Sequence, residues 1–208
     1  MGTGDGVSPS ASDQPLLEFL AVMRRLRAEC PWKREQTHRT LARYLLEETH
    51  ETLEAIDTGE ATGEWDHLRE ELGDLLLQVY FHAVLAEESG AFTIDDVARG
   101  ISEKMHRRNP HVFGPPPADP ADAPQDAAAV NEVWQAIKER DKPRTARTDG
   151  LPDTLPALLY AAKVVERGAT APAQPADLGE RLLALVAEAV ADGIDPEQAL
   201  RDAVRRHG

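Results

Sequence analysis

Apolar residues recur at intervals of three and four along most of the chain, which is the spacing of one face of an α-helix. Such segments run from Leu16 to Arg27, from Thr40 to Asp57 and from Trp65 to Glu88. Further helices are expected at about 93–108, 127–140, 157–167, 178–191 and 196–206. We find no convincing strand pattern, so the sequence predicts an all-α protein.

Glycines and short polar residues indicate where these helices end and begin. Gly59 is expected to end the second helix and Gly90 the third. Thr93 is expected to cap the next helix, because Asp95 and Asp96 would lie in its first turn, where the helix dipole favours negative charge. These residues predict helices joined by short connections.

Segments rich in proline or polar residues divide the chain into regions. Residues 1–14 are polar and rich in glycine and serine, so we expect them to be disordered. Residues 15–140 are predicted to form the catalytic domain and 141–156 a linker that proline and glycine keep from being helical. Residues 157–208 form a smaller C-terminal region.

The charge balance restricts the possible partners. Lys and Arg number 23 against 37 Asp and Glu, giving a net charge of −14, which would repel duplex nucleic acid. The single Cys30 cannot form an intramolecular disulfide, and no apolar run approaches the roughly 18 residues of a membrane span. The first 15 residues lack the apolar segment of a signal peptide. We therefore expect a cytoplasmic protein that binds neither duplex nucleic acid nor membranes.

The helix expected at 40–57 carries carboxylates on its apolar side. Successive residues lie 100° apart on a helix, which places Glu48 beside Leu41 and Leu45, with Glu51 at the margin of that arc. Glu47 faces the opposite side. An ionised carboxylate among apolar groups is costly unless it is paired or bound to a metal, so Glu48 needs a partner.

The helix expected at 65–88 is apolar almost all round and should be buried. Glu71, Asp74, Gln78 and His82 nevertheless share one polar stripe, and the first two have the same three-residue spacing as the acids of the preceding helix. Four carboxylates from two helices can therefore converge. Carboxylate oxygens without cysteine or paired histidine suit Mg²⁺ or Mn²⁺, and such a site could bind a triphosphate and activate water.

Six short motifs occur in order along the chain between Leu16 and Leu159. They are Cys30-Pro31-Trp32, Gln36-Thr37-His38, Tyr44-Leu45-Leu46-Glu47-Glu48-x-x-Glu51, Glu70-Glu71-Leu72-Gly73-Asp74, Lys104-Met105-x-Arg107-Arg108-Asn109-Pro110 and Trp134-x-x-Ile137-Lys138. Together they resemble the MazG nucleoside triphosphate pyrophosphohydrolases of the all-α NTP pyrophosphatase superfamily. One departure is Lys33, which stands where that family commonly has aspartate.

The resemblance implies a helical bundle assembled as a homodimer. It implies Mg²⁺-dependent hydrolysis of a nucleoside triphosphate between its α- and β-phosphates, giving a monophosphate and pyrophosphate, as in housecleaning of the nucleotide pool. The metal ligands that it implies are Glu48, Glu51, Glu71 and Asp74, with Glu47 orienting or deprotonating the attacking water. The substrate-binding residues that it implies are Lys104, Arg108, Trp134 and Lys138.

Other functions are left open by the residues. The protein could be a related pyrophosphatase that is specific for one modified or pyrimidine nucleotide. It could also be a nucleotide-binding regulator with little turnover. A di-metal carboxylate oxidase is a further alternative, but it usually requires a Glu-x-x-His pair on each of two helices, and the helix expected at 65–88 has none. The intact set of four acids favours an enzyme over a regulator.

The C-terminal region repeats parts of the preceding domain. Leu178-Gly179-Glu180-x-Leu182-Leu183 parallels Leu72-Gly73-Asp74-Leu75-Leu76-Leu77, and Gly193-Ile194-Asp195-Pro196 parallels Ala91-Phe92-Thr93-Ile94. The helix that would bring Glu-Glu-x-x-Glu is replaced by a segment rich in proline and alanine. The sequence therefore predicts a degenerate second copy at 157–208 and a single active module.

Overall fold

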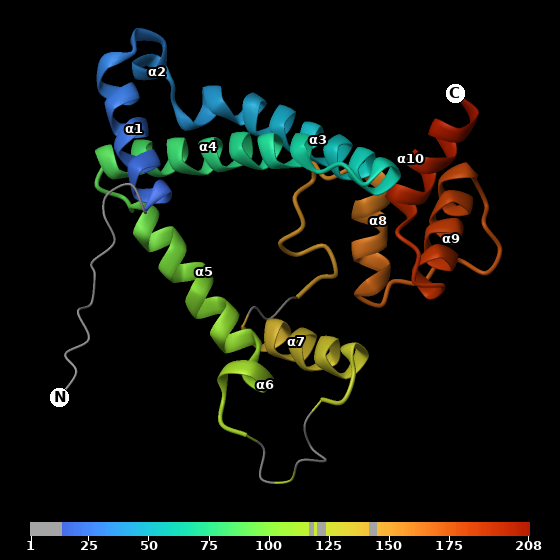
Figure 1. The fold of residues 1–208 in the computed structure, drawn as a ribbon. Helices are drawn as coiled ribbons and strands as arrows, with labels where there is room; N and C mark the ends of the chain where they lie inside the picture. The colour runs from blue at the N-terminus through green and yellow to red at the C-terminus, as the bar shows by residue number, and fades with distance from the viewer. Residues whose placement is uncertain (1–13, 117–118, 120–123, 142–144) are drawn as a thin grey trace. The chain divides into compact units, whose positions relative to one another are not determined.

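The computed structural model describes residues 14–116, 119, 124–141 and 145–208. Every regular element in these ranges is an α-helix, which confirms the predicted all-α class (Figure 1). Residues 1–14 were predicted to be disordered, and all of them except Gln14 lie outside the described ranges. The chain divides into two compact units, the first ending at Pro115 and the second beginning at Pro116. None of the described helices is long and apolar enough to cross a membrane.

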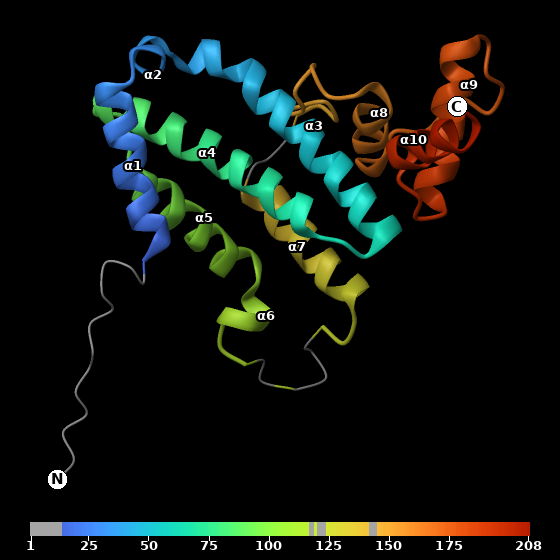
Figure 2. The same ribbon diagram turned by 45° about the horizontal axis from the view of Figure 1, so that its top comes forward.

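Two long helices form the centre of the first unit. α3 (His38–Thr62) and α4 (Asp66–Glu88) run antiparallel and pack along their lengths, as Figures 1 and 2 show. The helices that surround this pair in the chain are α1 (Pro15–Glu29), α2 (Pro31–Glu35), α5 (Ile94–Arg108) and α6 (Pro110–Phe113). The two single-turn helices, α2 and α6, were not predicted.

The hydrophobic core lies where α1 and the start of α3 meet the C-terminal half of α4. Met23, Leu41 and Phe81 are its largest fully buried side chains. Arg27 forms an ion pair with Glu88 at 2.8 Å, which links α1 to the last turn of α4. Such an exposed pair stabilises the fold little, so burial of the apolar side chains holds α1 in place.

Gly59 does not end α3, contrary to the prediction. The helix continues to Thr62, and Gly63 ends it with a left-handed backbone at φ 78°. Gly59 is buried within the helix because the ring of Trp65 packs on it: an added Cβ would lie 2.5 Å from Cε3 of that ring. Glycine is needed at position 59 because it has no side chain, which leaves room for the Trp65 ring. The prediction relied instead on the backbone freedom of glycine.

α4 is buried unevenly along its length. Tyr80, Phe81 and Val84 are buried, as predicted for a helix that is apolar all round. Leu72 and Val79 are instead 51% and 43% exposed, so the single chain leaves part of α4 uncovered. The acidic residues of the polar stripe begin in this more open half.

Thr93 caps α5, as predicted. Its hydroxyl accepts a hydrogen bond from the backbone N–H of Asp96, and the Asp96 carboxylate accepts one from the backbone N–H of Thr93 at 2.9 Å. The hydrogen bonds to Thr93 are the main cause that lowers the pKa of Asp96, and the charge of the nearby Arg99 lowers it further. The reciprocal bonds satisfy backbone donors that the first turn of a helix leaves free.

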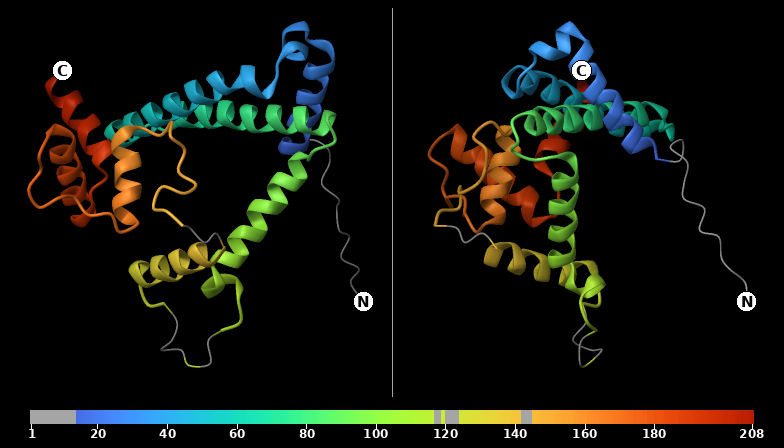
Figure 3. Two further views of the ribbon diagram at one scale, coloured as in Figure 1. Left: turned by 180° about the vertical axis from the view of Figure 1, so that it is seen from behind. Right: turned by 90° about the vertical axis from the view of Figure 1, so that its left-hand side faces the viewer.

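The second unit contains four described helices. They are α7 (Ala127–Asp141), α8 (Ala157–Glu166), α9 (Leu178–Ala191) and α10 (Pro196–His207). α8 packs against α9 and α10 (Figure 3). Ala162 and Val186 are buried. The predicted helices agree with these bounds to within one residue at each end.

Candidate metal centre

Three carboxylates converge between α3 and α4. Glu48 comes from α3, and Glu71 and Asp74 come from α4, where a spacing of three residues puts them on one face. One carboxylate oxygen from each residue lies within 4.8 Å of the other two. The structure therefore brings together three of the four metal ligands that the sequence predicts.

The three acids differ in their access to solvent. Glu48 and Glu71 are half-buried, whereas Asp74 is exposed. The cluster therefore has two acids set into the interface between the helices and one at its mouth. Solvent therefore reaches the cluster from the side of Asp74.

Glu71 has one oxygen that lacks a partner. Its Oε1 lies 3.0 Å from Nε2 of His67, one turn earlier on α4. Its Oε2 is buried and accepts no hydrogen bond within the part of the chain that the structure describes. A buried carboxylate oxygen without a partner is costly, and a divalent cation shared with the neighbouring acids would satisfy it.

The negative charges of the cluster repel one another. Burial raises the pKa of Glu48, and the nearby Asp74, Glu51 and Glu71 raise it further, while a hydrogen bond from Gln78 lowers it. The ionised form of Glu48 is therefore disfavoured by its surroundings as long as no cation is bound. A bound divalent cation would reverse this balance.

The donor set fits a hard cation. The three converging residues offer only carboxylate oxygens, which suit Mg²⁺ or Mn²⁺. Structural zinc is usually held by cysteine and histidine, and neither residue belongs to this group of three. The chemistry of the site thus agrees with the cation expected from the sequence.

The two other acids of α3 that were predicted to act at the site, Glu47 and Glu51, lie outside the group of three. Glu51 is exposed one turn beyond Glu48, close enough to raise the pKa of Glu48. Glu47 is also exposed, and its Oε1 lies 3.5 Å from Nη2 of Arg43. The roles of Glu51 as a metal ligand and Glu47 in orienting water stay predictions.

The cationic and aromatic residues predicted to bind substrate lie on two other helices. Lys104 is half-buried and Arg108 is buried, and both stand on α5 one turn apart. Trp134 and Lys138 stand on α7 in the second unit, where Lys138 Nζ lies 4.8 Å from the centre of the Trp134 ring. Their contacts with a nucleotide also stay predictions.

Gln78 and His67 are site residues that the sequence analysis did not assign. Gln78 lies near Glu48 and lowers its pKa, and Nε2 of His67 lies 3.0 Å from Oε1 of Glu71. Each stands four residues from an acid of the cluster on α4, Gln78 after Asp74 and His67 before Glu71. That spacing was the available signal, because residues four apart on a helix are neighbours.

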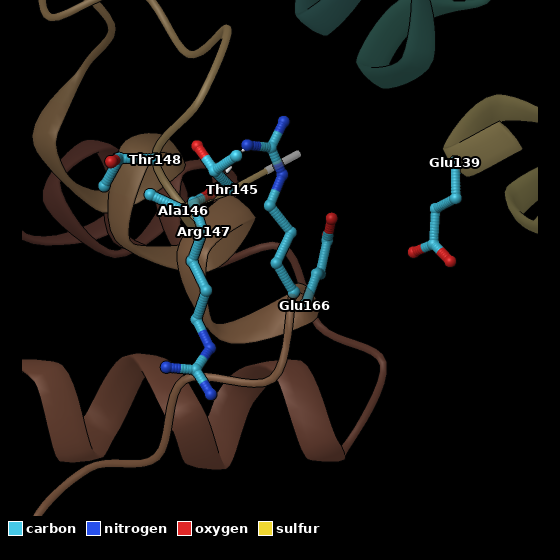
Figure 4. Close-up of a pocket in the computed structure, with 7 residues that line it drawn as sticks. Glu139, Thr145, Ala146, Arg147, Thr148 and Glu166 are labelled. Carbon is cyan, nitrogen blue, oxygen red and sulfur yellow. Dashed lines mark hydrogen bonds between the residues drawn. The ribbon is translucent and has the colours of Figure 1, made fainter. Parts of the chain in front are cut away.

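A cavity of about 910 Å³ in the second unit contains none of these acids. Figure 4 shows Glu139 on the opposite side of the opening from Thr145, Arg147 and Glu166. Arg167 also lines the cavity, and its Nη1 donates to the backbone carbonyl of Arg147. This guanidinium therefore holds the adjoining loop, and the mixed charges of the lining provide no cluster comparable to that of α3 and α4.

Comparisons with known proteins agree with this site. The family model described as the MazG nucleotide pyrophosphohydrolase domain matches residues 36–113, which include the three converging acids. The chain is 42% identical over 207 residues to the "uncharacterized 26.1 kDa protein in blaB 3'region" of Streptomyces cacaoi, covering 94% of this chain and 81% of that protein.

Other relatives are named by their function. The nucleoside triphosphate pyrophosphohydrolase of Mycobacterium tuberculosis is 41% identical over 94% of this chain, and that of Escherichia coli K12 is 42% identical over 72% of it. These alignments cover 56% and 55% of the two relatives, so the chain spans about half of their length. The family model, the relatives and the acid cluster lead to one assignment: the chain belongs to the MazG family of nucleotide pyrophosphohydrolases.

Proposed function

We propose that the chain hydrolyses nucleoside triphosphates between the α- and β-phosphates, with a divalent cation bound by the acids of α3 and α4. The products would be a nucleoside monophosphate and pyrophosphate. The observation that carries the proposal is Oε2 of Glu71, which is buried beside Glu48 and Asp74 and accepts no hydrogen bond from any residue that the structure describes. The names of the two pyrophosphohydrolase relatives support the same reaction.

The chain's own residues would bind the cation and position the substrate. Glu48, Glu71 and Asp74 would hold Mg²⁺ or Mn²⁺, and Glu51 would complete the set by a change of rotamer. Bound Mg²⁺ supplies charge neutralisation for the triphosphate and an activated water. Once a second copy covers its side of α3, Glu47 would orient the attacking water toward the α-phosphorus, and pyrophosphate would be the leaving group.

Local cations are needed because the protein as a whole is acidic. A net charge of −14 repels a triphosphate from most of the surface. Lys104 and Arg108 on α5, and Lys138 beside Trp134 on α7, would bind the phosphates and the base. Housecleaning of the nucleotide pool is the role that we propose for this activity.

We further propose that the protein acts as a homodimer. Large apolar side chains are exposed on the central pair of helices of the single chain. They are Leu45, Leu46, Leu53 and Ile56 on α3, and Leu72 and Val79 on α4. A soluble monomer rarely exposes a contiguous apolar surface of this kind, so a second copy would cover it and enclose the acidic cluster.

The C-terminal region would be a degenerate copy without a metal site. Asp177 accepts a hydrogen bond from the backbone N–H of Glu180 at 2.8 Å, and the Glu180 carboxylate accepts one from Ala176. Both acids are thus used to cap α9. Asp195 caps α10 as Thr93 caps α5, which supports the proposed correspondence between the two copies.

The proposal is tested by incubating the protein with a panel of nucleoside triphosphates, with Mg²⁺ and with EDTA. We expect pyrophosphate to be released only with Mg²⁺. Release of orthophosphate would overturn the proposed position of cleavage. If nucleotides bind but no product is formed, the result would favour a nucleotide-binding regulator over an enzyme.

Substitution of the acids tests the site itself. Because each substitution removes a cation ligand, we expect Glu48→Ala and Asp74→Ala to lower kcat/KM at least about 100-fold. Glu54→Ala, an exposed acid of α3 outside the cluster, is the matched control and should retain activity. Full activity in Glu48→Ala or Asp74→Ala would contradict the assignment of the centre.

A further inference from the structure

α9 in the second unit exposes three leucines. Leu178, Leu182 and Leu185 are 61%, 48% and 60% exposed. Their spacing of four and three residues places them on one side of the helix, which we call the leucine stripe. α9 packs against α8 and buries Val186, yet that packing does not cover the stripe. A row of exposed leucines of this kind indicates a contact surface.

The leucine stripe has a counterpart in the first unit. In the repeated sequence, its three residues align in order with Leu72, Leu76 and Val79 of α4. Leu72 and Val79 are exposed as well, on the surface that we propose a second copy of the chain covers. The two copies of the repeat thus expose the same side of the same helix.

An adjacent side of α9 differs between the two copies of the repeat. In α4 this side carries Leu75 and His82, and Nδ1 of His82 lies 2.8 Å from Nδ1 of His38 on α3. The alignment places Arg181 and Glu188 at these positions of α9, and both are exposed. Where no counterpart of α3 covers the helix, the residues are therefore charged, as is usual on a surface in contact with water. The leucine stripe is also exposed but stays apolar, so contact with water does not account for it.

We propose that the leucine stripe packs antiparallel against the leucine stripe of a second copy of the chain. A twofold axis then brings Leu182 opposite Leu185 of the second copy, and Leu178 opposite Ala189. Ala189 is half-buried and extends the same side of the helix by one turn. A twofold contact needs only one self-complementary surface, and the stripe supplies it.

Charges beside the stripe match this arrangement. Arg181 and Glu188 are seven residues apart, so about 10 Å separates them along α9 and they do not pair within one helix. In the antiparallel pair, Arg181 of each chain lies beside Glu188 of the other, which gives two ion pairs at the edge of the contact. A parallel pair would place like residues at the same level and align the two helix dipoles. Charge complementarity therefore favours a second copy in the antiparallel direction.

The contact is too small to hold two chains together alone. α9 has 15 residues fewer than one, at 14 residues, whereas stable interfaces bury about 1,200–2,000 Å² in total. The leucine stripe therefore pairs between chains that the proposed interface on α3 and α4 already joins, where the effective concentration is high. The inference rests on the proposed homodimer and goes beyond the proposed chemistry.

Cross-linking of the full-length protein tests the contact. Cys30→Ser removes the single native cysteine, and Leu178→Cys and Ala189→Cys are then introduced into separate forms with different affinity tags. The two forms are co-expressed, and the species that carries both tags is purified and treated with a short bifunctional thiol reagent. We expect the two chains to become linked, because the two cysteines face each other across the contact.

Each form alone is the control for the direction of the helices. Two copies of Leu178→Cys place their cysteines about 16 Å apart along the antiparallel pair, which is beyond the reach of a short reagent. Neither form should therefore be linked when it is expressed by itself. Linked chains in the Leu178→Cys form alone would overturn the antiparallel arrangement.

Leu200→Cys is the matched control for the position of the contact. Leu200 is 54% exposed on α10, much as the leucines of the stripe are on α9. Combined with Ala189→Cys in the same way, it should give little linked product. Equal linking of Leu200→Cys and Leu178→Cys would overturn a specific contact at the leucine stripe.

Charge reversal tests the ion pairs. Arg181→Glu or Glu188→Arg, introduced into both chains of the mixed species, should lower the yield of linked chains because like charges then meet. The double variant Arg181→Glu/Glu188→Arg should restore the yield, which damage to the fold would not allow. An unchanged yield in both single variants would overturn the pairing of Arg181 with Glu188.

The outcomes separate this inference from the proposals made above. If the mixed species is isolated but its chains are not linked, the contact between the α9 helices falls and the homodimer remains. If no mixed species can be isolated, both fall. Release of pyrophosphate by the same preparations tests the proposed reaction independently.

Discussion

A stacked pair of histidines continues the polar stripe of α4 beyond Gln78. The rings of His38 and His82 are 4° from parallel, with the two Nδ1 atoms 2.8 Å apart. One ring must donate and the other accept, so at least one histidine is neutral. Burial, followed by repulsion from His38, holds the pKa of His82 below its usual value of 6.5.

The histidine pair predicts a pH dependence of stability. The unfolded chain binds a proton at His82 at higher pH than the folded chain does, so the free energy of unfolding should fall as the pH drops through about 6.5. Denaturant unfolding between about pH 8 and pH 5.5 measures this slope. His82→Phe should flatten it, and identical slopes in the two proteins would contradict the assignment.

Residue spacing was sufficient to predict much of the candidate site. The three-residue interval between Glu71 and Asp74, and the inward angle of Glu48, correctly indicated that these acids converge. A helical wheel gives the direction of Cβ but not the rotamer, so it could not separate Glu51 from the other three. Nor could it show that Gln78 lies near Glu48, because that proximity depends on the register of two helices.

At the scale of whole helices, periodicity predicted the elements better than it predicted their ends. The predicted bounds of α9 agree with the structure, because Asp177 and Gly193 stand at its two ends as cap and stop. α3 was predicted too short because Gly59 and Gly63 look alike in sequence. Only the packing of Trp65 onto Gly59 tells them apart, and that contact requires the turn between α3 and α4.

The contact between Gly59 and Trp65 predicts an unusual effect of alanine in a helix. Gly59→Ala should destabilise the protein by about 1–3 kcal/mol, because the added methyl group displaces the Trp65 ring. Alanine normally favours a helix over glycine by about 1 kcal/mol, which offsets part of this loss. Chemical unfolding followed by tryptophan fluorescence measures the difference.

Gly100→Ala on α5 is the control for that substitution. A Cβ added at Gly100 meets no atom within 4 Å, so this variant should be unchanged or stabilised by up to about 1 kcal/mol. Equal stabilisation in both variants would show that Trp65 does not need the space above Gly59.

At the scale of the whole molecule, the sequence indicated an assembly larger than one chain. The apolar pattern of α4 anticipated more burial than the single chain provides at Leu72 and Val79. The sequence pattern shows that a side chain is apolar. It does not show whether the same chain or a second copy covers that side chain. The bounds predicted for the catalytic domain at 15–140, the linker at 141–156 and the C-terminal region at 157–208 stay predictions.

The proposed homodimer predicts the effect of a charge on this surface. Leu46 is 60% exposed in the single chain, so Leu46→Arg should fold normally. A charge buried at the centre of an interface costs about 2 kcal/mol or more, which raises the dimer Kd about 30-fold. Sedimentation at several protein concentrations would detect the shift toward monomer.

Leu200→Arg provides the comparison for the dimer surface. Leu200 is 54% exposed on α10 in the second unit, outside the proposed interface. This variant should sediment as the wild-type protein does. A monomeric wild-type protein, or equal dissociation in both variants, would contradict an interface on α3 and α4.

The uneven burial of α4 has a consequence for the order in which its backbone opens. Amide hydrogens around Ala83 to Ala86, within the buried half, should exchange with solvent only through global unfolding. Those around Leu72 lie in the half that carries the acids and should exchange through smaller local openings. Binding of the cation and of the second copy would slow amide exchange mainly in that half. The half of α4 that carries the acids would therefore become ordered only when the cation and the second copy are bound.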